Sequence, residues 1–364
     1  MPTHYFYGNN PSKIDKYKTF WNLDNTDYPL IGFTLRGYLP LEEYTVTKLW
    51  RSGIMLQPEM INPEDFIDDE EKILRKEELI DDDIIRGCSP MASAIDWLSV
   101  VLGSECLVSS GTTLAKELNY PWDELKDFYL EKENPWYKKY IEFLKVLVNK
   151  AKGHFPVSHG AFGGPSDLLR ILRGANQSIF DLIDEPKKAS KLLDKIGDII
   201  IEMTEDSWKH LPLFHGGYFD AMYQLWAPGP IARIQEDFSS LYSPELYRKY
   251  IKPVDRYIAK QFSHSYIHLH STSMFLLEDI LDIQELKCFQ INNDVGGPPI
   301  QQMIPYFRMV QEKERSLLIR GSFKKEDIKL LKKSLNPRGL YLFIIVKNYE
   351  EINHLKSLLL SKWH

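Results

Sequence analysis

The stretch Ser265-Tyr266-Ile267-His268-Leu269-His270 predicts a short β-strand with two chemically different faces. Its apolar residues share one face, and Tyr266, His268 and His270 share the other, because strand side chains alternate in direction. The apolar face suits packing against helices, so the polar face must point into a barrel or a cleft. Two imidazoles at positions i and i+2 can reach one metal ion, one anion or one substrate group, although hydrogen-bonded core histidines show the same pattern.

Apolar, strand-like runs recur on both sides of this stretch and alternate with helical patterns. The eight runs are residues 105–109, 155–161, 211–215, 231–237, 265–270, 286–291, 315–320 and 340–346. The helical patterns cover residues 122–151, 166–174 with 187–210, 244–262, 274–281, 299–313, 325–334 and 349–361. Strands that alternate with helices indicate an α/β fold with a parallel sheet, and eight such strands close a (β/α)8 barrel of the TIM type. An open, doubly wound sheet stays the alternative, because residues 216–230 have no helical pattern.

The first ninety residues are irregular, apart from a possible strand at 28–35. We expect residues 1–90 to be an N-terminal extension packed on the barrel and residues 91–364 to be the barrel domain. The extension could cap the barrel mouth or mediate the contacts of a homodimer. Its acidic run at 64–83 is typical of a solvated helix rather than of a metal site.

Composition restricts the class of protein. The hydrophobic share of 43% and the charged share of 26% are those of a soluble globular chain, and the net charge of -6 argues against nucleic acid or a membrane as the main partner. We find neither a secretory signal nor an apolar run long enough to span a bilayer. Cys88, Cys106 and Cys288 lack disulfide or metal-ligand spacing, so we expect a cytoplasmic protein.

Most of the predicted strands end in a polar residue on one face. Active sites of parallel barrels lie at the carboxyl ends of the strands, so these side chains should meet at one mouth. They are His159, His215, Asp237, His268, His270, Gln290 and Arg320. Such convergence indicates an active site, with His268 and His270 as candidate metal ligands. The third ligand stays open among Cys288, Asp294, His215 and Asp237.

Two loops and one pair of carboxylates offer further candidates. Residues 160–167 join a strand to a helix through glycines, but no Walker lysine follows, so a helix start is favoured over a nucleotide site. The aromatic loop at 216–230, which includes Trp226, could be a lid that excludes water or an ordinary packed loop. Asp237 with Asp167 or Asp294 could also form a carboxylate pair of the glycosidase kind.

Several segments together resemble the uroporphyrinogen decarboxylase superfamily. They are GGPSDLLRILRG at 163–174, WAPG at 226–229, QEDF at 235–238, SPEL at 243–246 and YIHLH at 266–270. The resemblance covers roughly residues 90–360, and it implies a (β/α)8 barrel. The superfamily contains porphyrinogen decarboxylases and zinc-dependent methyltransferases that work with corrinoid proteins or thiols.

The resemblance also bears on the metal. In the methyltransferases, zinc is held by a His-x-Cys pair on one strand and by a further cysteine near the last strand. The pair here would be His268 and His270, and residues 340–346 contain no cysteine. A site with two histidines favours zinc acting as a Lewis acid toward an ether oxygen or an amine nitrogen.

The decarboxylase branch offers the second hypothesis. Its arginine-rich loop holds an anionic tetrapyrrole, and RGYLP at 36–40 provides only Arg36 where two arginines are expected. Its catalytic aspartate, which follows Phe-Ser, has no clear equivalent. Porphyrinogen decarboxylation therefore ranks second, and a binding barrel without catalysis ranks third.

The sequence thus favours a methyltransferase that moves a methyl group between a small substrate and a corrinoid or related acceptor, with the corrinoid supplied by a partner protein. His268 and His270 would bind zinc or polarise the substrate, and Asp237 would help to orient it. Arg320 would pair with its anionic end, and Trp226 would help to close the site. The other expected substrate contacts are His159, His215, Gln235 and Gln290.

Overall fold

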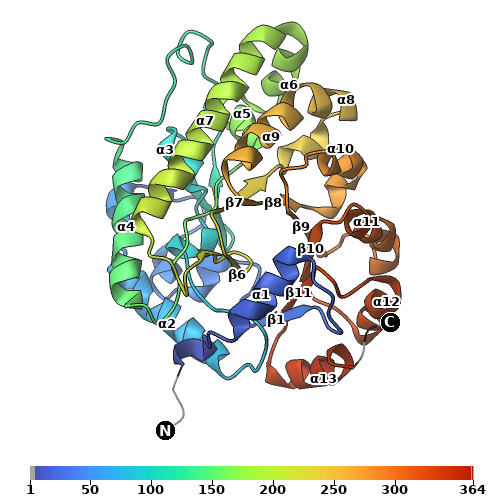
Figure 1. Ribbon diagram of the computed structural model, residues 1–364. Helices are drawn as coiled ribbons and strands as arrows, with labels where there is room; N and C mark the ends of the chain where they lie inside the picture. Colours follow the sequence, from blue (N-terminus) through green and yellow to red (C-terminus); the bar gives the residue numbers. More distant parts are fainter. Residues whose placement is uncertain (1–4, 362, 364) are drawn as a thin grey trace.

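The computed structural model describes residues 5–361 and 363, and its central element is a parallel sheet (Figure 1). Six strands form the sheet, in the spatial order β1-β11-β10-β9-β8-β7. They are β1 (Leu30–Thr34), β7 (Ile231–Gln235), β8 (His264–Leu269), β9 (Cys288–Asn292), β10 (Ser316–Gly321) and β11 (Leu340–Ile345). The chain therefore has an α/β fold, as predicted.

A helix follows each strand from β7 to β11, and Figure 1 shows these helices on the outside of the arc of strands. They are α9 (Lys252–Gln261), α10 (Leu277–Leu281), α11 (Ile300–Glu312), α12 (Lys325–Ser334) and α13 (Tyr349–Leu359). A short helix α8 (Pro244–Leu246) and a π-helical turn (Tyr247–Ile251) precede α9. This alternation is the one that the spacing of apolar runs predicts.

The helices of the first half of the chain are α1 (Lys13–Asn22), α2 (Glu64–Glu78), α3 (Trp97–Val101), α4 (Pro135–Ala151), α5 (Pro165–Arg173), α6 (Ala175–Asp184) and α7 (Pro186–His210). Helix α4 begins thirteen residues later than the predicted range 122–151. Pro135 occupies its first turn, and the Asn134 side chain accepts a hydrogen bond from the Trp136 amide, which fixes the start. Among all the described residues, in both halves of the chain, no helix is long and apolar enough to cross a membrane.

Three of the eight predicted parallel strands are wrong. Residues 105–109 form β3 (Cys106–Ser109) of a separate antiparallel sheet with β2 (Met55–Leu56) and β4 (Thr112–Ala115). The two-residue turn at 110–111, with Gly111 at a φ of 72°, lets β3 pair with β4 locally. Residues 211–215 contain one antiparallel bridge, between Phe214 and Gly217, and residues 155–161 contain one parallel bridge, between Val157 and Cys88. The regular parallel sheet thus has six strands instead of a ladder of eight.

The strand order separates the remaining alternatives. The strands β7 to β11 follow one another in sequence, and β1 lies beside β11, so the order lacks the reversal of a doubly wound sheet. The first strand lies next to the last, which is the order that a barrel requires. Residues 30–34, expected within the N-terminal extension, are thus a strand of the main sheet. The main sheet therefore includes residues from before position 91, the predicted start of the barrel domain.

The two faces of the sheet have separate apolar cores. Side chains such as Ile267, Ile291 and Leu342 pack under the outer helices. The inner face packs on α1 and on the hairpin of β5 (Tyr218–Asp220) and β6 (Leu225–Ala227). The inner core contains Tyr17, Phe20, Trp226, Tyr266, Cys288, Leu318 and Tyr341. Because Phe20 accepts a hydrogen bond from Ser316, the first residue of β10, α1 lies at the amino-terminal end of the strands. The opposite end is left for a site.

Candidate metal centre and its cavity

The carboxyl ends of β7 and β8 bring three possible metal ligands together. Gln235 is in register with His268, so Asp237, two residues further on, lies beside His270. The Nε2 atoms of the two imidazoles are 3.2 Å apart. Oδ1 of Asp237 lies 3.8 Å from Nε2 of His268 and 3.7 Å from Nε2 of His270. The three ligand atoms thus lie within 4.8 Å of one another, close enough to share one cation.

His268 is buried and held from behind. Its Nδ1 contacts Oε1 of Gln290 on β9, and the Tyr223 hydroxyl lies 2.8 Å from the same nitrogen. Gln290 donates through Nε2 to Asn292 at 2.9 Å, so its Oε1 is the atom left to accept from the imidazole. Burial lowers the pKa of His268 to about 4, although Asp237 favours its charged form. His268 therefore holds its proton on Nδ1 and directs a lone pair from Nε2 toward the cluster.

His270 is oriented by Asp294, which comes from the loop after β9. Its Nδ1 lies 2.6 Å from Oδ1 of Asp294, and the Ser271 amide and hydroxyl donate to Oδ2 of the same carboxylate at 2.8 and 2.7 Å. The hydrogen bond to Asp294 raises the pKa of His270. Burial alone would raise the pKa of Asp294, but the hydrogen bonds from His270 and Ser271 outweigh it and lower the pKa to about 2. Asp294 is thus an outer partner of the cluster and not its third ligand.

The arrangement of the three side chains suits a bound divalent cation better than hydrogen bonds among the three side chains alone. Both Nδ1 atoms are engaged, so both Nε2 atoms face the same point, and Oδ1 of Asp237 is buried without a hydrogen-bond partner among the described residues. Oδ2 of Asp237 accepts from Gln235 at 2.7 Å, which fixes the carboxylate. A donor set of two imidazoles and one carboxylate, each with an outer hydrogen-bond partner, is compatible with a zinc ion.

This cluster lies on the wall of a cavity of about 740 Å³. The cavity lies between the sheet, the β3–β4 hairpin and the start of α5. Its polar lining includes Asp96, Thr113, Asp167, Arg170, Arg233, Gln235, Asp237, His268, His270 and Asn292. Burial raises the pKa of both Asp96 and Asp167, and the neighbouring Asp237 raises the pKa of Asp167 further. The carboxyl groups of Asp96 and Asp167 therefore keep their protons to a higher pH than exposed carboxyl groups do.

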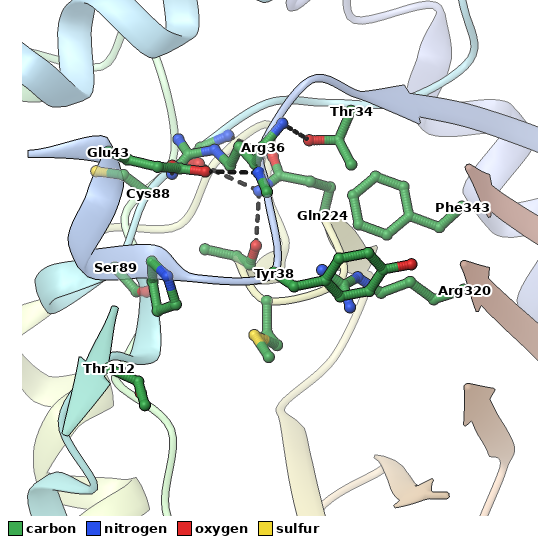
Figure 2. A pocket seen from close by; sticks show the side chains of 15 residues that line it. Thr34, Arg36, Tyr38, Glu43, Cys88, Ser89, Thr112, Gln224, Arg320 and Phe343 are labelled. Atoms are coloured by element: carbon green, nitrogen blue, oxygen red, sulfur yellow. Dashed lines mark hydrogen bonds and ion pairs between the residues drawn. The ribbon is translucent and has the colours of Figure 1, made fainter. Parts of the chain in front are cut away.

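Arg320 lies apart from the metal cluster, in a second cavity of about 220 Å³ (Figure 2). Its guanidinium carbon is 5.5 Å from the centre of the Tyr38 ring, which lies over it. Arg36 of the same cavity pairs with Glu70 at 3.1 Å and with Glu43 at 3.7 Å. Figure 2 also shows Gln224 and Phe343 on the wall of this cavity. The prediction that Arg320 lies beside the paired histidines is therefore wrong. Arg320 is on β10, and β9 separates that strand from β8, which carries the histidines.

Three predicted substrate contacts lie elsewhere. His159 is buried, stacks on Phe162 and contacts the Gly160 carbonyl at 2.7 Å, so it is a packed histidine of the core. His215 is exposed in the tight turn before β5, with a φ of 49°. Trp226 is buried in the inner core and donates from Nε1 to the Phe214 carbonyl at 2.7 Å. The loop at 216–230 thus contains a hairpin that packs on the inner face of the sheet, which agrees with the packed-loop alternative and not with the lid.

Two residues of the cavity were missed as site residues. Arg233 shares a strand face with Gln235 and Asp237, and that period-two pattern was the available signal. Tyr223 reaches His268 from the β5–β6 turn across 45 positions of sequence, and no local pattern indicates such a contact.

Comparison with known proteins agrees with the fold. No family model and no curated protein matches the sequence. Among solved structures, the chain is similar to a methyltransferase from Methanosarcina mazei, with a TM-score of 0.61, 14% sequence identity and 98% of each chain covered. At this level of identity the similarity shows a shared fold over nearly the whole length.

Proposed function

We propose that this protein is a metal-dependent enzyme of the uroporphyrinogen decarboxylase superfamily that transfers a methyl group between a small substrate and a corrinoid or related acceptor. The observation that carries the proposal is the convergence of Nε2 of His268, Nε2 of His270 and Oδ1 of Asp237 on one point of the cavity wall. The similarity in fold to a methyltransferase supports the same reading. In this proposal the irregular segments at 83–88 and 156–158, which hydrogen-bond to β1 and to each other, complete a barrel wall of the (β/α)8 type.

The metal would be zinc, held by His268, His270 and Asp237. When bound, it would supply a Lewis acid for an ether oxygen or an amine nitrogen of the substrate. Gln290 and Asp294 hold the two imidazoles in the tautomer that leaves Nε2 free, and Gln235 fixes the carboxylate. The bond between the methyl carbon and the heteroatom breaks, and its electron pair stays on the heteroatom. The acceptor supplies the electron pair of the new bond, so the transfer is balanced without any oxidant.

The acceptor would be a corrinoid carried by a separate protein, since the cavity is far smaller than a corrinoid with its carrier would need. The small substrate would occupy the cavity of about 740 Å³. Drug-sized ligands occupy pockets of roughly 300–1,000 Å³, so this volume suits a substrate and the reacting end of a cofactor. A homodimer is a further proposal, which solution mass measurements would address.

Porphyrinogen decarboxylation is less well supported. A substrate with several carboxylates needs several free cations. Arg36, the candidate from the sequence, already pairs with Glu43 and Glu70, and Arg320 is in the second cavity beneath Tyr38. Retention of tetrapyrrole binding at full affinity in Arg36→Ala would remove that role for Arg36.

The test of the proposal is metal analysis beside activity. Purified protein should contain about one equivalent of zinc per chain, and the double variant His268→Ala with His270→Ala should lose the metal and the methyl transfer while it stays folded. The matched control is His354→Ala, a replacement on the surface helix α13. A folded double variant that keeps its metal and its activity would end this assignment.

A further inference from the structure

Arg233 is a buried cation that has no hydrogen-bond partner within the described part of the chain. Its side chain lies on the face of β7 that also carries Gln235, and the residue is only 7% exposed. Nε, Nη1 and Nη2 all lack a hydrogen-bond partner among the described residues. Arg233 nevertheless lines the same cavity as Asp237 and His268. A buried charge that makes none of its hydrogen bonds is costly, so something outside the chain should satisfy it.

The other buried arginines of the described chain form hydrogen bonds to aspartate side chains. Arg86 is fully buried, and it donates to both carboxylate oxygens of Asp82 at 3.0 and 2.7 Å. Arg173 is also buried, and it forms a two-point contact with Asp181. Against this pattern, the unpaired guanidinium of Arg233 is an exception, and it lies at a cavity rather than inside a packed core.

The surroundings of Arg233 keep it charged without binding it. Burial lowers the pKa of Arg233, but Tyr266, Asp220 and other nearby acidic groups outweigh this and raise it above its ordinary value. The Asp220 carboxylate accepts from the Tyr223 amide at 3.2 Å, and no described carboxylate lies within ion-pair distance of the guanidinium. The five N–H groups of a guanidinium form a rigid fork that matches a planar, two-oxygen anion.

We propose that Arg233 binds the carboxylate of the substrate, and that the substrate is a small methylated carboxylic acid. This inference rests on the proposed function, because it places the methylated heteroatom at the cluster of His268, His270 and Asp237 and the carboxylate at Arg233. A carboxylate fits better than a phosphate, since a dianion would be repelled more strongly by Asp220 and Asp237, which lie near enough to act on the Arg233 charge. Arg233, and not Arg320, is then the anchor for the anionic end.

Binding of a carboxylate probe to metal-free protein tests the inference. After treatment with a chelator, the protein is titrated with 3-methoxypropionate and with the neutral 3-methoxypropionamide in a calorimeter. The carboxylate should bind and the amide should not. Arg233→Met should weaken carboxylate binding by at least about tenfold, the loss expected for a charge-assisted hydrogen-bonded pair. Arg51→Met, which replaces an exposed arginine, is the matched control and should bind the acid as the unaltered protein does.

Two further measurements keep the outcome decisive. Arg233→Met should melt no lower than the unaltered protein, because it removes an unsatisfied buried charge; a structural arginine would show a large loss of melting temperature. Arg233→Lys, which keeps the charge but loses the fork, should bind the acid with intermediate affinity. Equal affinity of the acid and the amide would overturn the inference. So would carboxylate binding that survives Arg233→Met and disappears in Arg320→Met.

The same experiment separates this inference from the proposed function. Carboxylate binding through Arg233 in a protein that never retains zinc would leave the inference standing and remove the metal-dependent mechanism. Zinc retention together with carboxylate binding that is insensitive to Arg233→Met would do the opposite.

Discussion

The charged side chains of the two cavities differ in how many of their hydrogen bonds are made within the protein. In the smaller cavity, Arg36 pairs with Glu43 and Glu70, and the Tyr44 hydroxyl donates to Glu70 at 2.5 Å. In the larger cavity, all three guanidinium nitrogens of Arg233 and Oδ1 of Asp237 lack a hydrogen-bond partner among the described residues, whereas in the smaller cavity the buried atoms without one are Nε of Arg320 and Oε2 of Glu43. Both cavities lie toward the carboxyl ends of the strands, so depth and position do not explain the contrast.

The contrast teaches which groups are structural. A buried ion pair whose members satisfy one another already has its partners, so a ligand would have to displace one of them. A buried group without a partner gains a full set of hydrogen bonds when a ligand arrives. We therefore assign recognition to the unpaired residues of the larger cavity and a structural role to Arg36.

The largest effect should come from removing the unpaired carboxylate. Asp237→Ala deletes one of three proposed ligands and should lower zinc affinity by more than the roughly 10- to 100-fold that a lost outer partner costs. Competition with a fluorescent zinc chelator measures this change. The control is Asp123→Ala, which removes an exposed carboxylate on the surface. Unaltered zinc affinity in Asp237→Ala would mean that the two histidines do not share their metal with this residue.

The second prediction concerns stability, and it compares the paired Arg36 directly with Arg233. Arg36→Met leaves Glu70, which is 2% exposed, without its cation, and it should lower the free energy of unfolding by about 3 kcal/mol. Arg233→Met leaves no such orphan and should cost nothing. Urea unfolding of both variants provides the comparison. An equal loss in the two variants would show that pairing in the static structure does not report the structural role.

The sequence predicts the second half of the fold well because its signals are local. The alternation of apolar runs and helices between residues 231 and 359 reappears as β7 to α13 with small shifts at the ends. In the first half the helices reappear as α4, α5 and α7, but the strand pairing was not predicted. The reason is physical: β3 pairs with its neighbour through a tight turn at Gly111, while β1 pairs with β11, about 300 residues away. An apolar run reveals that a strand forms, but it does not reveal which strand becomes its partner.

The site follows the same division. His268, His270, Gln235 and Asp237 converge because strand parity and register carry them to one end of the sheet, and both can be inferred from spacing. The same reasoning places Trp226 and His215 wrongly, since it treats residues 211–215 as a strand and leaves the following loop open between a lid and a packed loop. The difference between Arg233 and Arg320 could not be predicted, because it depends on segments that are distant in the sequence: the Tyr38 ring lies over the guanidinium of Arg320, whereas Arg233 lines the cavity of the metal cluster.

The smallest effect is a pH dependence that should run in opposite directions for zinc binding and for stability. The hydrogen bond to Asp294 raises the pKa of His270, whereas burial lowers the pKa of His268 to about 4. His268 is already neutral near neutral pH, and zinc competes with the proton of His270 at any pH below the raised pKa of that imidazole. The zinc affinity should therefore rise about tenfold per pH unit below the pKa of His270 and level off above it.

For the metal-free protein the sign is reversed. Because the pKa of His270 is higher in the folded state than its ordinary value of about 6.5, its contribution to stability is complete below that value and is lost as the pH rises through the folded pKa. Asp294→Asn removes the charge that holds the proton. It should flatten this decline in melting temperature and move the levelling-off of zinc affinity to lower pH, while it weakens the zinc affinity at high pH by about tenfold through the lost orientation of the ring. Ser263→Ala, beside His264 and away from the cavity, should change neither curve. If Asp294→Asn left both pH curves in place, Asp294 would not control the proton of His270, and the outer partner of the cluster would have to be sought elsewhere.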